Sequence, residues 1–107
     1  MGIETQGTLE ITKEDTVRLS LLLRLIEKPV KVQVILLLYV EPQLTDKQIY
    51  ARLKYSPAIL GTVLKSCVKY GLAENKQGRY ELTRVGRKVA EFLIELTETA
   101  KEELWRS

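Results

Sequence analysis

Apolar residues recur along most of this chain every three or four positions, a spacing typical of amphipathic helices. Thr12 followed by Asp15 has the form of a capping box and predicts a first helix over 12–28 that begins near residue 13. This helix carries two apolar stripes on roughly opposite sides. One stripe consists of Leu19, Leu22, Leu23 and Ile26, and the other of Val17, Leu21 and Leu25. A helix of a small domain needs only one buried stripe, so the second stripe predicts a contact with another chain. The alternative is a central helix that the same subunit covers on both sides.

Two prolines, Pro29 and Pro42, bound the next apolar segment. Proline fits the first turn of a helix and also ends one. Between them Val30, Val32 and Val34 alternate as in a strand, whereas 35–40 is a continuous apolar run. The length of the segment and the helical pattern that follows favour a buried helix.

Two short helices joined by a tight turn come next. Thr45 predicts the N-cap of a helix over 46–54, with Ile49 and Leu53 on its core face. Ser56 predicts the cap of the following helix and Pro57 its first residue. Such a pair is typical of a helix-turn-helix.

The second helix of this pair has two distinct faces. Residues at helical spacing on one side predict its core face: Leu60, Leu64 and Cys67. Small and cationic residues share the opposite side: Ala58, Thr62, Lys65 and Lys69. Small residues allow close approach to base edges and lysines bind phosphates, so this face predicts a DNA contact. A solvated helix surface is the alternative.

Two residues of the same helix have more than one interpretation. Gly61 stands in mid-helix, where it costs about 1 kcal/mol relative to Ala. Close packing against the preceding helix, or against a DNA backbone, would explain it. Cys67 is interpreted as a small core residue, with an intersubunit disulfide or a redox switch as the alternative.

A short hairpin and a long helix complete the chain. Gly71 predicts the end of the second helix, and 72–74 and 79–82 predict a hairpin around 75–78 that carries Lys76 and Arg79. Thr83 predicts the cap of a last helix over 84–106. At about 30 Å this helix exceeds what one small core needs, and Ile94 and Trp105 lie off its apolar stripe. These features predict a dimer contact, with an exposed, frayed end as the alternative.

Charge is distributed unevenly along the 107 residues. Residues 44–90 carry a net charge of +7, whereas 1–43 carry −1 and 91–107 carry −3, which suits a polyanion-binding face. The chain contains one Cys and no His, which excludes histidine catalysis and the usual Cys/His metal clusters. Neither a signal peptide nor a membrane span is evident, so we expect an intracellular, soluble, cytoplasmic protein. Little His, Asn and Cys beside abundant Lys and Glu is thermophile-like.

The segment 44–93 resembles the winged helix-turn-helix core of MarR- and ArsR-type regulators and their small archaeal relatives. The matching positions are Leu53, Ser56-Pro57, Leu64, Gly71-Leu72, Tyr80, Leu82-Thr83 and Gly86. The resemblance implies a mainly α-helical α+β fold with a β-hairpin wing, an extra N-terminal helix and a long C-terminal helix, forming a single domain over 1–107. It also implies a recognition helix at 57–70 and a wing tip at 76–79. Two departures are the short wing and Gly61-Thr62-Val63, where the family usually has Arg, His or Gln.

We therefore expect a homodimeric DNA-binding protein, most simply a transcriptional regulator of double-stranded DNA without cofactor or metal. The expected DNA contacts are Ser56, Ala58, Thr62, Lys65, Lys69, Lys76 and Arg79. The expected dimer contacts are Val17, Leu21, Leu25, Ile94 and Trp105. The alternatives are a winged-helix protein-interaction module and a weakly specific, chromatin-type DNA binder. An enzyme is not expected, because no His, Cys pair or Gly-rich phosphate loop supplies the chemistry.

Overall fold

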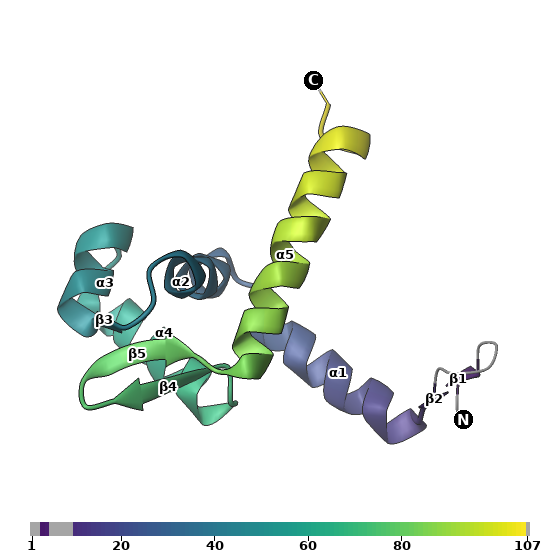
Figure 1. The fold of residues 1–107 in the computed structure, drawn as a ribbon, viewed down its shortest axis with the longest axis horizontal. Coiled ribbons are helices and arrows are strands. Elements are labelled where there is room, and N and C mark those ends of the chain that lie inside the picture. Colours follow the sequence, from purple (N-terminus) through teal and green to yellow (C-terminus); the bar gives the residue numbers. More distant parts are fainter. Residues whose placement is uncertain (1–2, 5–9, 107) are drawn as a thin grey trace.

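The computed structural model describes residues 3–4 and 10–106, and Figure 1 shows their arrangement. Its helices are α1 (Lys13–Leu25), α2 (Pro29–Val40), α3 (Asp46–Leu53), α4 (Pro57–Lys69) and α5 (Arg84–Glu103). The strands are β1 (Ile3–Glu4), β2 (Glu10–Ile11), β3 (Leu44–Thr45), β4 (Ala73–Lys76) and β5 (Arg79–Leu82). β1 pairs with β2, and the other three form an antiparallel sheet in the order β3-β5-β4. No helix among these residues is long and apolar enough to cross a membrane.

The body of the molecule is a winged helix-turn-helix, as expected from the sequence. α2, α3 and α4 pack together with the three-stranded sheet, and the β4–β5 hairpin forms the wing beside α4 (Figure 1). α1 and α5 leave this body in different directions (Figure 1). The predicted fold class, with its extra N-terminal helix and long C-terminal helix, is therefore confirmed.

Side-chain caps fix the start of four helices. Thr12 and Asp15 form the predicted capping box of α1, and Thr45 and Gln48 form a second one on α3. The Ser56 hydroxyl accepts a hydrogen bond from the Ile59 amide at 3.2 Å and caps α4. Four helices end earlier than expected: α1 at residue 25 rather than 28, α3 at 53 rather than 54, α4 at 69 rather than 70, and α5 at 103 rather than 106.

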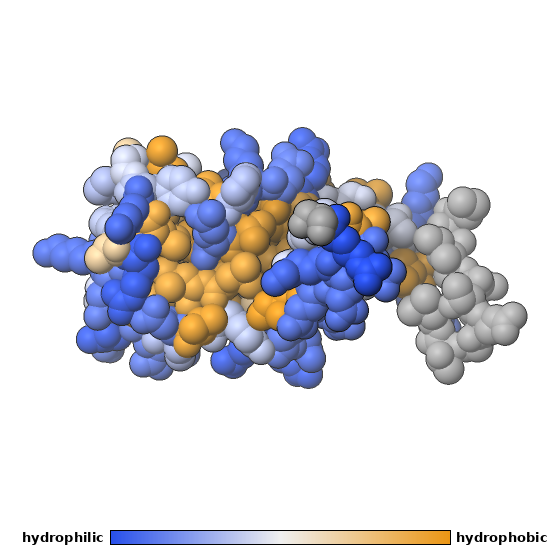
Figure 2. All heavy atoms as spheres, turned by 90° about the horizontal axis from the view of Figure 1, so that it is seen from above, coloured by the Kyte–Doolittle hydropathy of each residue, from blue (hydrophilic) through white to orange (hydrophobic). Residues whose placement is uncertain are grey.

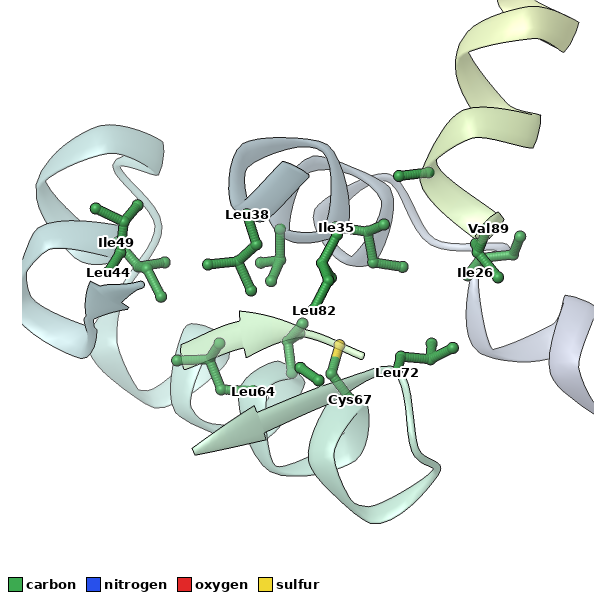
Figure 3. Close-up of a cluster of buried hydrophobic side chains, with 14 of the residues drawn as sticks. Ile26, Ile35, Leu38, Leu44, Ile49, Leu64, Cys67, Leu72, Leu82 and Val89 are labelled. Carbon is green, nitrogen blue, oxygen red and sulfur yellow. The ribbon is translucent and has the colours of Figure 1, made fainter. Parts of the chain in front are cut away.

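The core lies between α2, α4 and the sheet (Figure 3). α2 is the predicted buried helix, with Val34, Ile35 and Leu38 at its centre. The core face of α4 is confirmed: Leu60, Val63, Leu64 and Cys67 are buried there. From α3 the core receives Ile49, which is fully buried.

The end of α4 is tied to the start of α5 by a compact joint. Gly71 has a φ of +81°, and the Leu72 amide donates to the Cys67 carbonyl at 2.8 Å, which closes α4 with a Schellman motif. The Thr83 amide donates to the Leu72 carbonyl at 3.0 Å, and the Thr83 hydroxyl donates to the Gly71 carbonyl at 2.6 Å. The same hydroxyl accepts from the Gly86 amide at 3.0 Å. We call residues 71–72 together with 83–86 the α4–α5 joint.

The sheet differs from the expectation in two details. β3 was not predicted; its residues Leu44 and Thr45 pair with Tyr80 and Arg79 of β5. The wing is also tighter than expected, because β4 extends to Lys76 and leaves a two-residue turn, Gln77–Gly78. Both turn residues have positive φ, the geometry of the turns that match strand twist in hairpins.

Candidate nucleic-acid interface

The outward face of α4 brings together four of the residues predicted to contact DNA. Ala58, Thr62, Lys65 and Lys69 are all exposed. The Thr62 hydroxyl donates to the Ala58 carbonyl at 3.0 Å, and the Lys69 ammonium lies 5.4 Å from the centre of the Tyr70 ring. Because the core face holds α4 against the body, this opposite face points to solvent over the length of the helix. It is an open surface with small residues at its start and cations at its end.

Ser56 lies at the start of the same helix. It is exposed, but its hydroxyl oxygen already accepts the Ile59 amide, so its first role is to cap α4. The hydroxyl hydrogen is still available as a donor.

The wing cations are engaged within the protein. The Lys76 ammonium lies 2.6 Å from a Glu81 carboxylate oxygen and 3.4 Å from one of Glu74. Lys76, together with the Gln43 amide that donates to Glu81 at 3.2 Å, holds the pKa of the Glu81 carboxyl below its usual range. Arg79 donates to the Gln43 carbonyl at 3.3 Å. The wing tip therefore offers less uncompensated positive charge than its sequence suggests.

Shallow grooves flank α4 on both sides. One lies between α4 and the wing and is lined by Lys65, Val68, Lys69, Asn75 and Tyr80. The other lies between α4 and the start of α2; its charged lining residues are Lys28 and Lys31. Sequence reasoning missed these two lysines, because they lie in the segment whose net charge is −1 and only the packing of α2 on α4 brings them to the interface.

Gly61 lies on the side of α4 that faces α3. A Cβ built on it would be 3.9 Å from the Tyr50 hydroxyl, which is an ordinary van der Waals distance. Packing against α3 therefore does not require glycine at this position. The other explanation considered from the sequence, close packing against a DNA backbone, stays a prediction.

Cys67 belongs to the core. Its side chain is 3% exposed, and burial raises the pKa of the thiol to about 11, an effect that the nearby charge of Lys31 opposes. This environment favours the core interpretation, because the reactive thiolate is scarce at neutral pH. The intersubunit disulfide or redox switch stays the untested alternative. No cluster of three or more His, Cys, Asp or Glu suited to a metal ion occurs among residues 10–106.

The residues predicted at a dimer contact lie on the two projecting helices, except Trp105, which follows the end of α5. Val17 and Leu21 are each 55% exposed and Trp105 is 63% exposed, whereas Leu25 and Ile94 are partly buried. Sequence reasoning missed that part of the main apolar stripe of α5 is also exposed, at Val85, Phe92 and Leu96, as is Leu104 just past the end of the helix.

A groove between α1 and α5 is lined by two of these exposed residues, Val85 and Phe92. Its apolar lining includes Leu19, Leu23, Ile26, Val85, Val89 and Phe92. Figure 2 views the molecule from above and shows apolar side chains gathered on the side of α5 where α2 lies in Figure 1, bordered by hydrophilic ones. No residue of α1 (Lys13–Leu25) is buried.

Solved structures that share this fold include a MarR family protein and a possible HxlR family transcriptional factor. The chain superposes on a MarR family protein of Mycobacterium tuberculosis with a TM-score of 0.66 and 18% identity, over 83% of this chain and 75% of that one. It superposes on a possible HxlR family transcriptional factor of Thermoplasma volcanium with a TM-score of 0.64 and 22% identity, over 94% of each chain. At these identities the likeness shows the winged-helix fold. The sequence matches no protein-family profile and no curated protein.

Proposed function

We propose that this protein is a homodimeric, DNA-binding transcriptional regulator. α4 enters the major groove of double-stranded DNA with Ala58 and Thr62 toward the base edges and with Lys65 and Lys69 on phosphates. The wing, through Lys76 and Arg79, lies against the flanking backbone. The printed descriptions of the two structural neighbours, a MarR family protein and an HxlR family transcriptional factor, support this proposal.

One observation carries the DNA-binding part of the proposal, namely the open outward face of α4. In a helix-turn-helix the second helix is the one that reaches the bases. Here that face carries two lysines, neither of which forms an ion pair with any residue in 10–106. Such unpaired cations bind phosphates with the release of condensed counterions, which makes affinity depend strongly on salt.

The dimer part of the proposal rests on α1 and α5. Large apolar side chains on both helices are about half exposed, including Leu21, Phe92 and Leu96. Apolar surface of this extent is characteristic of an interface. A second copy of the chain covers it and places two α4 helices about 34 Å apart, one turn of DNA.

Binding to duplex DNA at several salt concentrations tests the proposal. We expect the wild type to bind at low salt and the affinity to fall steeply as salt rises. The double variant Lys65→Ala/Lys69→Ala should bind more weakly and with a shallower salt dependence, while its circular dichroism spectrum stays unchanged. The matched control Lys13→Ala/Lys101→Ala removes the same charge from α1 and α5 and should bind as the wild type does. No binding of the wild type at low salt would exclude the DNA-binding function.

A second candidate, a weakly specific chromatin-type DNA binder, is favoured by the chemistry of the α4 face. Thr62 is the one uncharged hydrogen-bonding side chain among its four residues, and it already donates to the Ala58 carbonyl. Base-specific readout usually needs longer polar side chains such as Arg, Asn or Gln. Selection of bound fragments from a random duplex pool separates the two candidates. An enriched motif supports a regulator, and an unchanged pool supports the chromatin-type function.

A further inference from the structure

Two lysines from the start of α2 lie beside the outward face of α4. Lys28 is exposed and Lys31 is partly buried, and both line the groove that also contains Ala58, Ile59 and Thr62. Between them the groove has an apolar floor that includes Val30 and Val63. No carboxylate lines this groove, and neither lysine forms an ion pair with any residue in 10–106. The groove is therefore cationic at its rim and apolar at its base.

This groove and the wing lie on opposite flanks of α4. At about 100° per residue, Ile59 and Ser66 turn toward α2, whereas Lys65 and Val68 turn toward the other flank. Val68 and Lys65 line the groove shared with Asn75 and Tyr80 of the wing. Lys28 and Lys31 thus lie on the side of α4 that faces away from the wing.

A helix in the major groove meets phosphates on both of its flanks. The groove is about 12 Å wide and a helix with its side chains measures about 10–12 Å across, so both backbones run beside it. On the wing side Lys76 is paired with Glu81 and Glu74. On the α2 side Lys28 and Lys31 form no ion pair with any residue in 10–106, and both line an open groove.

We propose that Lys28 and Lys31 bind the phosphates of the DNA strand on the flank of α4 opposite the wing. This inference rests on the proposed function, because it needs α4 in the major groove. Lys31 is partly buried and lines the groove beside the apolar residues Val30 and Val63, an arrangement in which a long cationic side chain packs its alkyl part on apolar surface. Ile59, which is 48% exposed, lies between the two lysines and the α4 face and contacts the sugar edge or a thymine methyl.

The test compares four full-length proteins on the same mixed-sequence duplex of about 40 base pairs, which accommodates two half-sites about one turn apart. They are the wild type, Lys28→Gln/Lys31→Gln, the charge-preserving Lys28→Arg/Lys31→Arg, and the control Lys13→Gln/Lys101→Gln. Dissociation constants are measured across a salt series. Circular dichroism and light scattering confirm that fold and mass are unchanged.

The variant Lys28→Gln/Lys31→Gln should bind DNA about tenfold more weakly near 0.1 M salt. Its plot of log K against log salt should be less steep, by about 0.9 in slope for each lost phosphate contact. The arginine pair should retain wild-type affinity and slope, because guanidinium also binds phosphate. The loss should be equal on unrelated duplex sequences, since phosphate contacts carry no sequence information.

Three results overturn the inference, and they are distinguishable. If the glutamine pair keeps wild-type affinity and slope while Lys65→Ala/Lys69→Ala loses affinity, the α2 site is excluded and the proposed function stands. If the wild type does not bind duplex DNA at low salt, both fail together. An equal loss in the Lys13→Gln/Lys101→Gln control also excludes the site, because the effect is then one of net charge.

Discussion

Gly86 lies so close to the carbonyl of Leu72 that a Cβ on the glycine would overlap the carbonyl oxygen. The same carbonyl accepts the Thr83 amide, so it cannot turn away without breaking the α4–α5 joint. A Cβ at Gly86 would also lie 3.2 Å from the Leu82 side chain. The glycine of the Leu82-Thr83-x-x-Gly86 pattern therefore has a packing cause in this chain, independent of DNA.

Gly86→Ala should lower the free energy of unfolding by about 3 kcal/mol, because the added methyl overpacks a site bounded by backbone. Chemical denaturation followed by circular dichroism measures the change. A variant with unchanged stability would mean that α5 can shift away from Leu72 without cost.

Gly61→Ala is the same substitution in a position with room for it. Its Cβ would meet the Tyr50 hydroxyl at 3.9 Å, so the variant should gain up to about 1 kcal/mol of stability from helix propensity. If close approach of DNA is the reason for the glycine, the same variant should bind DNA more weakly. Higher stability with unchanged affinity would show that position 61 does not approach the duplex.

Glu81→Gln should raise DNA affinity, because it removes a negative charge from the wing and weakens the ion pair that holds Lys76. Glu95→Gln on α5 is the matched control and should bind as the wild type does. Equal affinity of Glu81→Gln and the wild type across the salt series would argue against a phosphate contact by Lys76.

The ion pair between Lys76 and Glu81 predicts that the stability of the protein depends on pH. The folded protein lowers the pKa of Glu81, so the pair stabilises the fold above the unfolded value of about 4.3. This contribution is lost as the pH falls through the lower, folded pKa. Glu81→Gln should therefore be less stable than the wild type at neutral pH and equal to it in strong acid, as measured by urea denaturation at both pH values. A stability difference that stays constant with pH would exclude this ion pair as its cause.

Leu21→Glu and Phe92→Glu should each raise the dissociation constant of the proposed dimer at least about 100-fold. Burying such a side chain contributes roughly 1.5–3 kcal/mol, and each substitution occurs once in both copies. Analytical ultracentrifugation over a concentration series measures the mass. Ile59→Glu, which places the same charge at an exposed apolar position on α4, should leave the mass unchanged.

Cys67 should react slowly with thiol reagents in the native protein. Burial raises its pKa to about 11, so the thiolate is a minor species at pH 8. Reaction with a chromogenic disulfide should therefore need unfolding, and non-reducing denaturing electrophoresis should give the monomer mass. A band at twice the monomer mass that disappears on reduction would instead establish the intersubunit disulfide.

The helices and the wing followed from local signals in the sequence. Thr12, Thr45, Ser56 and Thr83 each precede a helix and cap it in the structure. β3 could not be found in this way, because two residues, Leu44 and Thr45, show no period and gain their pairing only from β5.

The candidate site was only partly accessible to sequence reasoning. The α4 face follows from helical spacing alone, whereas Lys28 and Lys31 join it through tertiary packing across about thirty positions of chain. At the α2 groove sequence reasoning missed cations, whereas at the wing it counted cations that are engaged within the protein. Lys76 and Arg79 look like free cations in the sequence. The β4–β5 pairing brings Lys76 to Glu81, and the β3–β5 pairing brings Arg79 to the Gln43 carbonyl.

The α4–α5 joint couples the orientation of α5 rigidly to that of α4. α5 measures about 30 Å, so tilting it by about 10° about the joint moves its far end by about 5 Å. Because Thr83 bonds both Gly71 and Leu72, the tilt cannot be absorbed by a slack linker between α5 and α4. In a dimer formed through α1 and α5, the crossing angle of the two α5 helices would therefore determine the distance between the two α4 helices.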